Sequence, residues 1–368
     1  MIKFHEPYIA KQQEQYILDV LRNSTYSSDK YRKSCSEFLS DMYQTENILI
    51  THSATAALEI ASKLIKLEHG KESNILLPSY TFSSTANAFL QDNHKINFID
   101  VSKDDMIVDK NIKLNKNEYC IVVHYSNSCF EFSNKGNNKI IEDAAQSFDA
   151  KFKGSYLGTF GKYGCISFHR TKNIHADFGG MIILNDNSLF DEAKYIYERG
   201  TDRSEVIAGN KNKYQWVEKG SSYQISELSS ALLLSQLEVK DKIKELRKEI
   251  YLTYKEKLTE LAKNELITLQ KIQSNLEPNY HAFYIISSTE NKKLINYLKN
   301  NGISAYIGYE PLHLSKFAKK NNLNLEKLPV TEKYYKKLVR LPIHTNISIK
   351  DANHVVNVLK NFYEKKRI

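Results

Sequence analysis

A lysine, an aspartate and a helix start built from small residues follow three separate apolar runs. Lys172 lies in SFHRTKN, just after GCISFH and shortly before a glycine pair. Asp143 lies in IIEDAAQ, at the end of the run NKII, while Ala54 and Thr55 follow ITHS. Ligands of parallel sheets collect beyond the carboxyl ends of the strands. The pattern therefore predicts that these residues share one site.

Each of these features also has an ordinary structural explanation. A lysine amine has a pKa of about 10.4 and becomes nucleophilic when burial or a nearby cation, such as Arg170, lowers that pKa. The alternative is an exposed surface lysine, which is the commoner case. Asp143 could face a protonated ring nitrogen or cap a following helix. The amides of Ala54 and Thr55 could bind phosphate or belong to a capped helix start. Together, however, the three features supply the contacts that pyridoxal phosphate needs.

The elements that would position these residues are apolar strands separated by helical patterns. Nearly continuous apolar strands of this kind indicate a mostly parallel sheet with helices on both faces, an α/β architecture. The strand-like runs cover residues 47–51, 74–82, 95–101, 118–125, 138–145, 163–169 and 179–186.

The pattern changes after Asp186. A helical stretch ends at Gly200, and a long amphipathic pattern over residues 223–261 is typical of one helix that joins two domains. The segments that follow indicate a compact α+β unit. We therefore predict a large α/β domain over residues 1–240 and a small C-terminal α+β domain over residues 241–368.

The composition argues against several functional classes. The net charge is +9, yet Lys and Arg are spread along the chain and mixed with Asp and Glu, so we expect no nucleic-acid binding but a surface suited to a small anionic ligand. There is no apolar stretch of about 20 residues and no secretory h-region, which predicts a cytoplasmic protein without a membrane partner. The four cysteines form no CxxC pair, so we expect neither a metal site nor a disulfide framework.

Five motifs resemble the DegT/DnrJ/EryC1/StrS sugar aminotransferases, which are pyridoxal phosphate enzymes of fold type I. The similarity extends from MIKFHEP to LVRLPIH, and within the family it is greatest to the transaminases that make dTDP-4-amino-4,6-dideoxygalactose. It implies a mostly parallel, seven-stranded-type sheet between helices and a smaller C-terminal α+β domain. The motifs are SFHRTKN, IEDAAQS, PSYTFSSTANA, SATAALE and GSSYQISELSSALLLSQLE.

The resemblance also implies a role for individual residues. Lys172 would bond covalently to the cofactor aldehyde and move the substrate proton, and Asp143 would keep the pyridine nitrogen protonated. Phe82 would stack on the ring, since an aromatic side chain suits a flat heterocycle, although it could also be a core residue. The remaining cofactor contacts would be Gln146 at the phenolic oxygen, Ala54, Thr55 and Ser167 at the phosphate, and Gln224, at a position where relatives usually have Asn, from the neighbouring subunit.

The implied enzyme is a homodimer with shared active sites. It would take an amino group from L-glutamate and transfer it to a nucleotide-linked keto-deoxysugar, with dTDP-4-keto-6-deoxy-D-glucose as the expected substrate, for O-antigen or other surface polysaccharide synthesis. The weaker candidates for sugar contacts are Arg203, Tyr309 and His313.

Two departures from the family pattern keep other functions open. Phe178 stands where relatives have the glutamate of EGG, and HYSN replaces HYAG at residues 124–127. The alternatives are a catalytically silent sensor or scaffold that binds the cofactor, a 3-keto-sugar aminotransferase, and a basic binding protein. Lys172 argues against the related dehydratases, which place histidine at that position.

Overall fold

The computed structural model describes residues 1–23, 29–133, 135–323 and 326–364. Its centre is a seven-stranded sheet in which every predicted apolar run forms a strand, so the α/β prediction is confirmed. Only β9 runs antiparallel to its neighbours; the other pairs are parallel. In sheet order, the strands are β1 (Ile48–Thr51), β9 (Gly180–Leu184), β8 (Gly161–Ser167), β5 (Asn137–Asp143), β4 (Glu118–Val123), β2 (Asn74–Pro78) and β3 (Lys95–Ile99).

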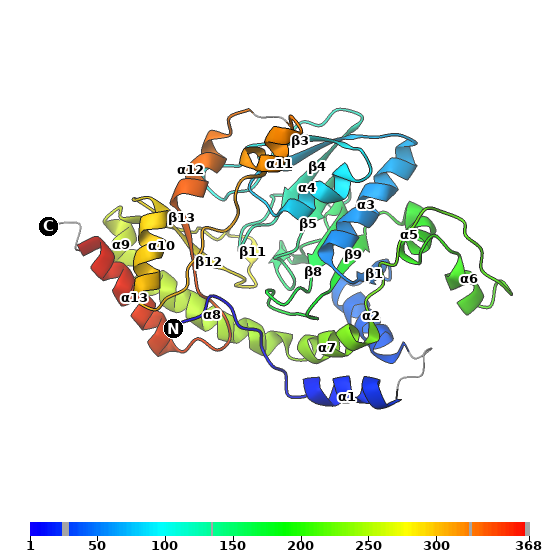
Figure 1. The fold of residues 1–368 in the computed structure, drawn as a ribbon, viewed down its shortest axis with the longest axis horizontal. Coiled ribbons are helices and arrows are strands. Elements are labelled where there is room, and N and C mark those ends of the chain that lie inside the picture. Colours follow the sequence, from blue (N-terminus) through cyan, green and yellow to red (C-terminus); the bar gives the residue numbers. More distant parts are fainter. Residues whose placement is uncertain (24–28, 134, 324–325, 365–368) are drawn as a thin grey trace.

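Both faces of this sheet are covered, which explains why its strands are apolar along almost their whole length. On one face α3 (Ala54–His69), α4 (Ser83–Leu90) and α5 (Phe190–Tyr197) share a core with side chains such as Ile121 and Ile182. On the other face α2 (Lys30–Tyr43) and α7 (Glu227–Leu237) pack on side chains such as Ile50 and Ile183. Figure 1 shows the strands enclosed between these helices.

The C-terminal part has its own core around a three-stranded antiparallel sheet. The strands, in the order β10 (Ile267–Leu269), β12 (Phe283–Ser287) and β13 (Leu338–Leu341), are covered by α8 (Lys240–Lys257), α10 (Asn291–Asn300) and α13 (Ile349–Glu364). The other elements are α1 (Gln13–Asn23), β6 (Lys151–Phe152), β7 (Ser155–Tyr156), α6 (Arg203–Ile207), α9 (Thr259–Lys263), β11 (Leu276–Glu277), α11 (Lys316–Lys320), α12 (Pro329–Lys337) and the 3-10 turns Asn187–Leu189 and Leu312–Leu314.

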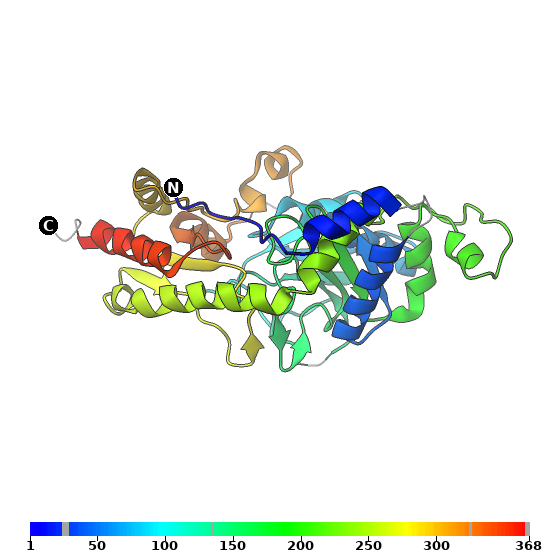
Figure 2. The same ribbon diagram turned by 90° about the horizontal axis from the view of Figure 1, so that it is seen from below.

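The single long helix predicted over residues 223–261 is wrong. The chain forms α7 and α8 separately, because Val239 between them has a ψ of 15° and leaves the helical backbone. Figure 2 shows the two helices lying end to end. The predicted domain boundary at residue 240 coincides with this break and stays a prediction.

The first residues of the chain are attached to the C-terminal part. The Ile2 amide donates to the Gly302 carbonyl at 2.7 Å, and the Ser304 amide donates to the Ile2 carbonyl at 3.0 Å. From there the segment runs across the molecule to α1 (Figure 1). Among the residues described, no helix combines the length and the apolar character needed to cross a membrane.

Candidate active site

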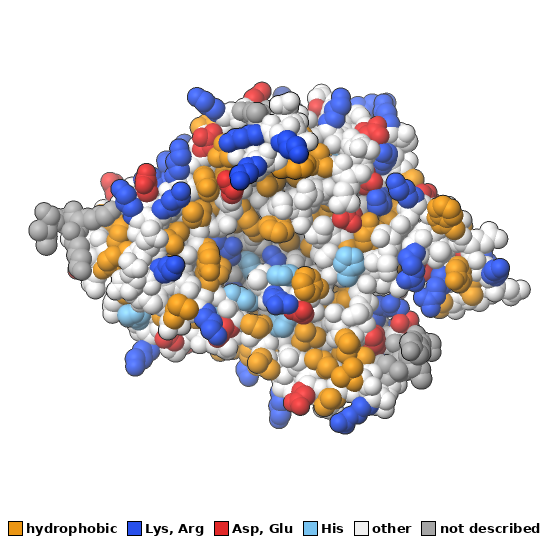
Figure 3. All heavy atoms as spheres, viewed as in Figure 1, with side chains coloured by type: hydrophobic (Ala, Val, Ile, Leu, Met, Phe, Trp, Pro, Cys, Tyr) orange, Lys and Arg blue, Asp and Glu red, His pale blue; other side chains and the backbone are white. Residues whose placement is uncertain are grey.

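A cavity of about 570 Å³ lies where the carboxyl ends of the central strands meet the C-terminal part and the N-terminal segment. In Figure 3 histidine side chains gather near the middle of the visible face, with lysine or arginine among them. Eight of the residues predicted from the sequence line this cavity: Ala54, Thr55, Phe82, Asp143, Gln146, Ser167, Lys172 and Tyr309.

Lys172 projects from a tight turn that follows β8. Its amide donates to the His169 carbonyl at 2.8 Å. Its side chain is partly buried, and what surface it keeps faces the cavity. The pKa of the amine is lowered from 10.5 to about 8, chiefly by burial; the negative charge of Asp143 opposes this shift and the positive charge of Arg340 adds to it. Near neutral pH a much larger fraction of this amine than of an exposed lysine is therefore neutral and able to act as a nucleophile.

The cation that acts on Lys172 is not the one expected from the sequence. Arg170 forms an ion pair with Asp177 at 2.8 Å, and both side chains are about half exposed. Arg340 of β13 acts instead. Arg170 therefore helps to close the turn that carries Lys172, since its amide also donates to the Asp177 carbonyl.

Asp143 ends β5, and its carboxylate is held by α4 and by its own backbone. The Thr85 hydroxyl donates to Oδ2 at 2.7 Å, and the Ala145 amide donates to Oδ1 at 3.2 Å. The residues after Asp143 form turns, so the alternative of a helix cap is wrong. The carboxylate is only 5% exposed and lines the cavity, where a cationic ring nitrogen could pair with it.

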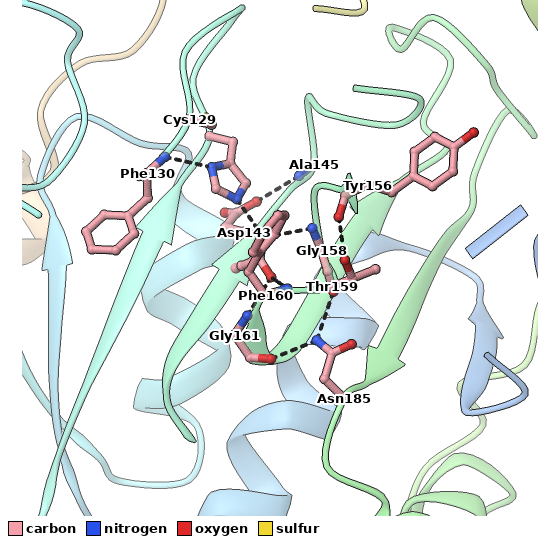
Figure 4. Close-up of polar contacts among 12 residues, drawn as sticks. Cys129, Phe130, Asp143, Ala145, Tyr156, Gly158, Thr159, Phe160, Gly161 and Asn185 are labelled. Carbon is pink, nitrogen blue, oxygen red and sulfur yellow. Dashed lines mark hydrogen bonds and ion pairs between the residues drawn. The ribbon is translucent and has the colours of Figure 1, made fainter. Parts of the chain in front are cut away.

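Glu142, beside Asp143, anchors the end of β5 to the chain that enters β8. Its fully buried carboxylate accepts hydrogen bonds from the amides of Gly158, Phe160 and Gly161 at 2.7–2.8 Å and from His124 Nε2 at 2.9 Å. Figure 4 shows these three amides converging close to Asp143. This network fixes the end of the strand that carries the Asp143 carboxylate, and the sequence carried no signal for it.

The start of α3 supplies backbone donors to the cavity wall. The Ser53 hydroxyl accepts from the Ala56 amide at 3.1 Å, so the predicted cap is real, yet the leading amides of Ala54 and Thr55 have no partner within the helix. Gly180 of β9 lies so close that a Cβ there would come within 2.4 Å of the Ala54 nitrogen. Such a helix start favours a phosphate group.

The aromatic and amide candidates, Phe82 and Gln146, also line the cavity. Phe82 is 58% exposed, which excludes the alternative of a core residue. Gln146 is held between the Ser126 amide, from which it accepts at 2.9 Å, and the Tyr309 hydroxyl, to which its side chain donates at 2.9 Å. Burial raises the pKa of Tyr309 to about 12, so this hydroxyl remains protonated.

Ser167, the last residue of β8, lies on the cavity wall with its side chain accepting from the His169 amide at 3.3 Å. In that bond the Ser167 oxygen is only an acceptor. The hydroxyl proton remains available to a phosphate.

Three predicted residues do not line the cavity. Gln224 pairs with Thr51 and donates to Glu198 at 2.8 Å. Arg203 begins α6, which Figure 1 shows at the edge of the molecule, far from the sheet centre. His313 is buried, with Nδ1 2.6 Å from the Ser79 hydroxyl. A sugar contact by His313 or Arg203 would need a different arrangement from the one described.

Several lining residues were missed because they come from distant parts of the chain. Their most evident effect is electrostatic: among the described lining residues Asp143 is the one acid, whereas Lys172, Arg247 and Arg340 are cations. Arg340 could have been found from the sequence, because it is a charged residue inside the apolar run LVRLPIH. A charge in a buried strand requires a partner or a ligand. The missed residues include Phe4, His5, His281, Arg247 and Arg340.

The structure shows where the two departures from the family pattern lie, Phe178 and the turn HYSN at residues 124–127. Phe178 lines the cavity, is 55% exposed and lies with its ring 5.5 Å from that of His169. In the turn 124–127, the left-handed residue is Ser126, with φ of 59°, rather than Asn127. Ser126 therefore supplies the left-handed residue of this turn, and Phe178 adds an apolar side chain to the cavity lining.

These residues fit pyridoxal phosphate. The cavity combines an amine of lowered pKa, a buried carboxylate, an aromatic face and a helix start that can hold phosphate, and the cofactor needs each of them. The fold and the site thus define an aminotransferase of fold type I.

The chain belongs to the DegT/DnrJ/EryC1/StrS aminotransferase family, whose sequence model matches residues 7–360. It is 26% identical, over 99% of its length and 98% of the relative's, to UDP-4-amino-4,6-dideoxy-N-acetyl-beta-L-altrosamine transaminase from Campylobacter jejuni. It is 24% identical to GDP-perosamine synthase from Escherichia coli O157:H7, over 99% of both chains. The protein is therefore a pyridoxal-phosphate-dependent nucleotide-sugar aminotransferase.

Solved structures agree on the fold. The pyridoxamine phosphate form of a Streptococcus pneumoniae sugar aminotransferase superposes with a TM-score of 0.88 at 19% identity, over 99% of this chain and all of that one. The Helicobacter pylori aminotransferase of pseudoaminic acid biosynthesis gives 0.87 at 20% identity, over 99% of both chains.

Proposed function

We propose that the enzyme takes an amino group from L-glutamate and transfers it to the keto carbon of a nucleotide-linked 4-keto-6-deoxy sugar, with dTDP-4-keto-6-deoxy-D-glucose as the first candidate. The observation that carries this proposal is the Lys172 amine of lowered pKa, which lines the same cavity as the buried Asp143 carboxylate. The name of the Campylobacter relative supports a 4-amino-4,6-dideoxy sugar as the product.

The cofactor supplies the electron sink that stabilises a carbanion, and the protein supplies position and proton transfer. Lys172 would hold the cofactor and then move the proton at the substrate carbon, which its pKa of about 8 allows near neutral pH. Asp143, held by Thr85, would keep the ring nitrogen protonated. Phe82 would stack on the ring and Gln146 would donate to its oxygen, leaving Ala54, Thr55 and Ser167 for the phosphate.

We propose further that the working unit is a homodimer in which Gln224 reaches the phosphate of the neighbouring site. The residue does not line the cavity of its own chain, and it lies just after the end of an excursion over residues 198–222 that carries the 81% exposed Trp216. A mixture of Lys172→Ala and Gln224→Ala proteins tests this point. Subunit exchange should restore activity, because one mixed site would be intact, whereas Gln224 acting within its own chain would give no recovery.

We also propose that the enzyme acts in the cytoplasm, in the biosynthesis of O-antigen or another surface polysaccharide. The four cysteines are free and buried, which suits a reducing compartment. Fractionation of the cells tests this setting: the protein should be recovered with the cytoplasmic fraction, and its recovery with another compartment would contradict the proposal.

The function is tested by the visible spectrum and by product analysis. Adding L-glutamate to the yellow holoenzyme should bleach it, and a panel of dTDP-, UDP- and GDP-linked 3-keto and 4-keto sugars should restore the colour with one member. NMR of the product then identifies the aminated carbon. The three nucleotides belong in the panel because the relatives are named for UDP and GDP sugars.

A silent sensor is the second candidate. A Geobacillus stearothermophilus relative, 25% identical, is named pleiotropic regulatory protein, and Phe178 at the cavity rim departs from the family pattern. A yellow protein that ignores every amino donor would support this reading and contradict transamination.

A further inference from the structure

His5, on the N-terminal segment, lines the cavity, and one hydrogen bond fixes where its ring proton lies. Its Nε2 atom is 2.7 Å from the Arg170 carbonyl. Because a carbonyl oxygen only accepts, Nε2 must carry the hydrogen. In the neutral ring the other nitrogen, Nδ1, is therefore a hydrogen-bond acceptor.

His281 also lines the cavity, and its proton is fixed on the other nitrogen by the residue that follows Lys172. The Asn173 side-chain amide donates to the Asn279 carbonyl at 2.7 Å, so its Oδ1 atom is the one that lies 3.0 Å from His281 Nδ1. An amide oxygen only accepts, so Nδ1 carries the hydrogen and Nε2 is the acceptor. The backbone is held as well, since the His281 amide donates to Asn279 Oδ1 at 3.1 Å.

Both acceptor nitrogens are open to a ligand. Within the described ranges, no protein group hydrogen-bonds to His5 Nδ1 or His281 Nε2. Neither nitrogen is one of the fully buried polar atoms that lack a partner, so each keeps accessible surface on a residue of the cavity lining. An acceptor in such a place needs a donor from whatever fills the cavity, because leaving it unpaired costs free energy.

Both rings stay neutral near pH 7. The pKa of His5 is lowered to about 4, chiefly by burial. Burial also lowers the pKa of His281, and the charges of Lys172, Arg340 and Arg247 add to that shift. His5 acts on His281 in the same direction, so the two rings lie in the same part of the cavity. They therefore offer two lone pairs where positive charge is already concentrated.

The donor that best suits these lone pairs is a neutral hydroxyl group. A further ammonium group would be repelled by the three cations. An ionised carboxylate or phosphate has no hydrogen to give. A hexose ring, in contrast, carries neighbouring hydroxyl groups, and each of them can donate one hydrogen bond without adding charge.

We propose that His5 and His281 accept hydrogen bonds from hydroxyl groups of the nucleotide-linked sugar, and so select a sugar whose hydroxyls near the reacting carbon are free. This inference rests on the proposed transamination and names the sugar subsite. The hydrogen bond of His281 to the neighbour of Lys172 keeps this acceptor beside the reacting amine. A site built to bind a hydroxyl rejects an analogue that lacks it, because the protein acceptor is then left unpaired.

The test compares sugars with and without hydroxyls. Bleaching by L-glutamate reports the donor half of the reaction, and bleaching by a dTDP-linked 4-amino-4,6-dideoxy sugar reports the sugar half. The wild-type holoenzyme should need about 10- to 100-fold more of the 2-deoxy or the 3-deoxy analogue for half-maximal rate. His281→Phe should abolish this preference for one analogue and His5→Phe for the other, while the preference between glutamate and other amino donors is kept. His354→Phe, at an exposed histidine of α13, is the matched control.

The preference for hydroxylated sugars separates substrate binding from a structural role. A histidine that only supports the turn at Lys172 would, when replaced, slow all three sugars alike and leave the preference intact. That outcome would overturn the assignment. If His281→Phe fails to fold, His281→Gln keeps an acceptor oxygen and should retain part of the preference, and the comparison of sugars on the wild-type enzyme needs no variant.

Calorimetry with dTDP-glucose, which has neither a keto nor an amino group, provides a readout without turnover. The wild-type protein should bind dTDP-glucose more tightly than its 2-deoxy or 3-deoxy analogue, and each variant should lose one of these differences. Analogues that bind as tightly as dTDP-glucose, or no binding of any of them, would overturn the assignment. A wild-type enzyme that bleaches with no amino donor would instead refute transamination, and the calorimetry would still decide the role of the two histidines.

Discussion

The titration of Lys172 is the most quantitative consequence of this site. Its pKa of about 8, against 10.5 for an unperturbed lysine, means that about a quarter of the amine is neutral at about pH 7.5, rather than about 0.1%. The difference is roughly 200-fold in the reactive form. It arises from burial first and from the charge of Arg340 second.

Competitive labelling of the apo-protein measures this pKa directly. An amine-selective reagent is added in trace amounts over a pH series, and the label on the Lys172 peptide is compared with that on exposed lysines by mass spectrometry. We predict a midpoint near pH 8 for Lys172. In Arg340→Gln the midpoint should move upward, because a neighbouring positive charge has been removed. A midpoint close to that of the exposed lysines would refute the electrostatic reasoning.

Four further changes have expected outcomes. Lys172→Met should stabilise the apo-protein by about 1–3 kcal/mol below pH 8, because the Lys172 amine binds its proton less tightly in the folded state than in the unfolded chain. This gain in stability should vanish as the pH rises from 8 to about 10.5, and thermal melts at several pH values would show the loss. Thr85→Val should weaken cofactor binding about tenfold in a spectroscopic titration, since Asp143 loses a hydrogen bond. Gly180→Ala should displace the start of α3 and raise the phosphate concentration needed to protect the apo-protein from unfolding. Glu142→Gln should lower the free energy of unfolding by about 2–4 kcal/mol in urea, because four buried donors share that carboxylate.

The sequence was most informative where function depends on neighbours along the chain. The strand ends carrying Asp143 and Lys172 were predictable, because a polar residue after an apolar run must face a ligand, a partner or solvent. The capped start of α3 was also predictable from SATAALE. All of these lie at strand ends of one sheet or in the helix that follows a strand, which is where the α/β pattern predicts ligands to bind.

The residues that the N-terminal segment and the C-terminal part contribute to the cavity could not be predicted from the sequence in this way. Phe4 and Arg340 are 336 residues apart and meet only because the N-terminal segment pairs with the C-terminal part. His313 shows the opposite case. The sequence predicts a ligand contact for it, whereas tertiary packing buries it beside Ser79, outside the cavity lining. The break between α7 and α8 was missed because the apolar spacing continues across Val239.

The covalent bond between Lys172 and the cofactor is tested most directly by reduction. The holoenzyme is treated with borohydride and digested with trypsin, and the peptide from Thr171 to Lys194, which contains Lys172 as a blocked cleavage site, is weighed. We predict that this peptide carries the mass of one reduced pyridoxyl phosphate group. A modified lysine elsewhere, or an unmodified Lys172 in a protein that is visibly yellow, would contradict the account.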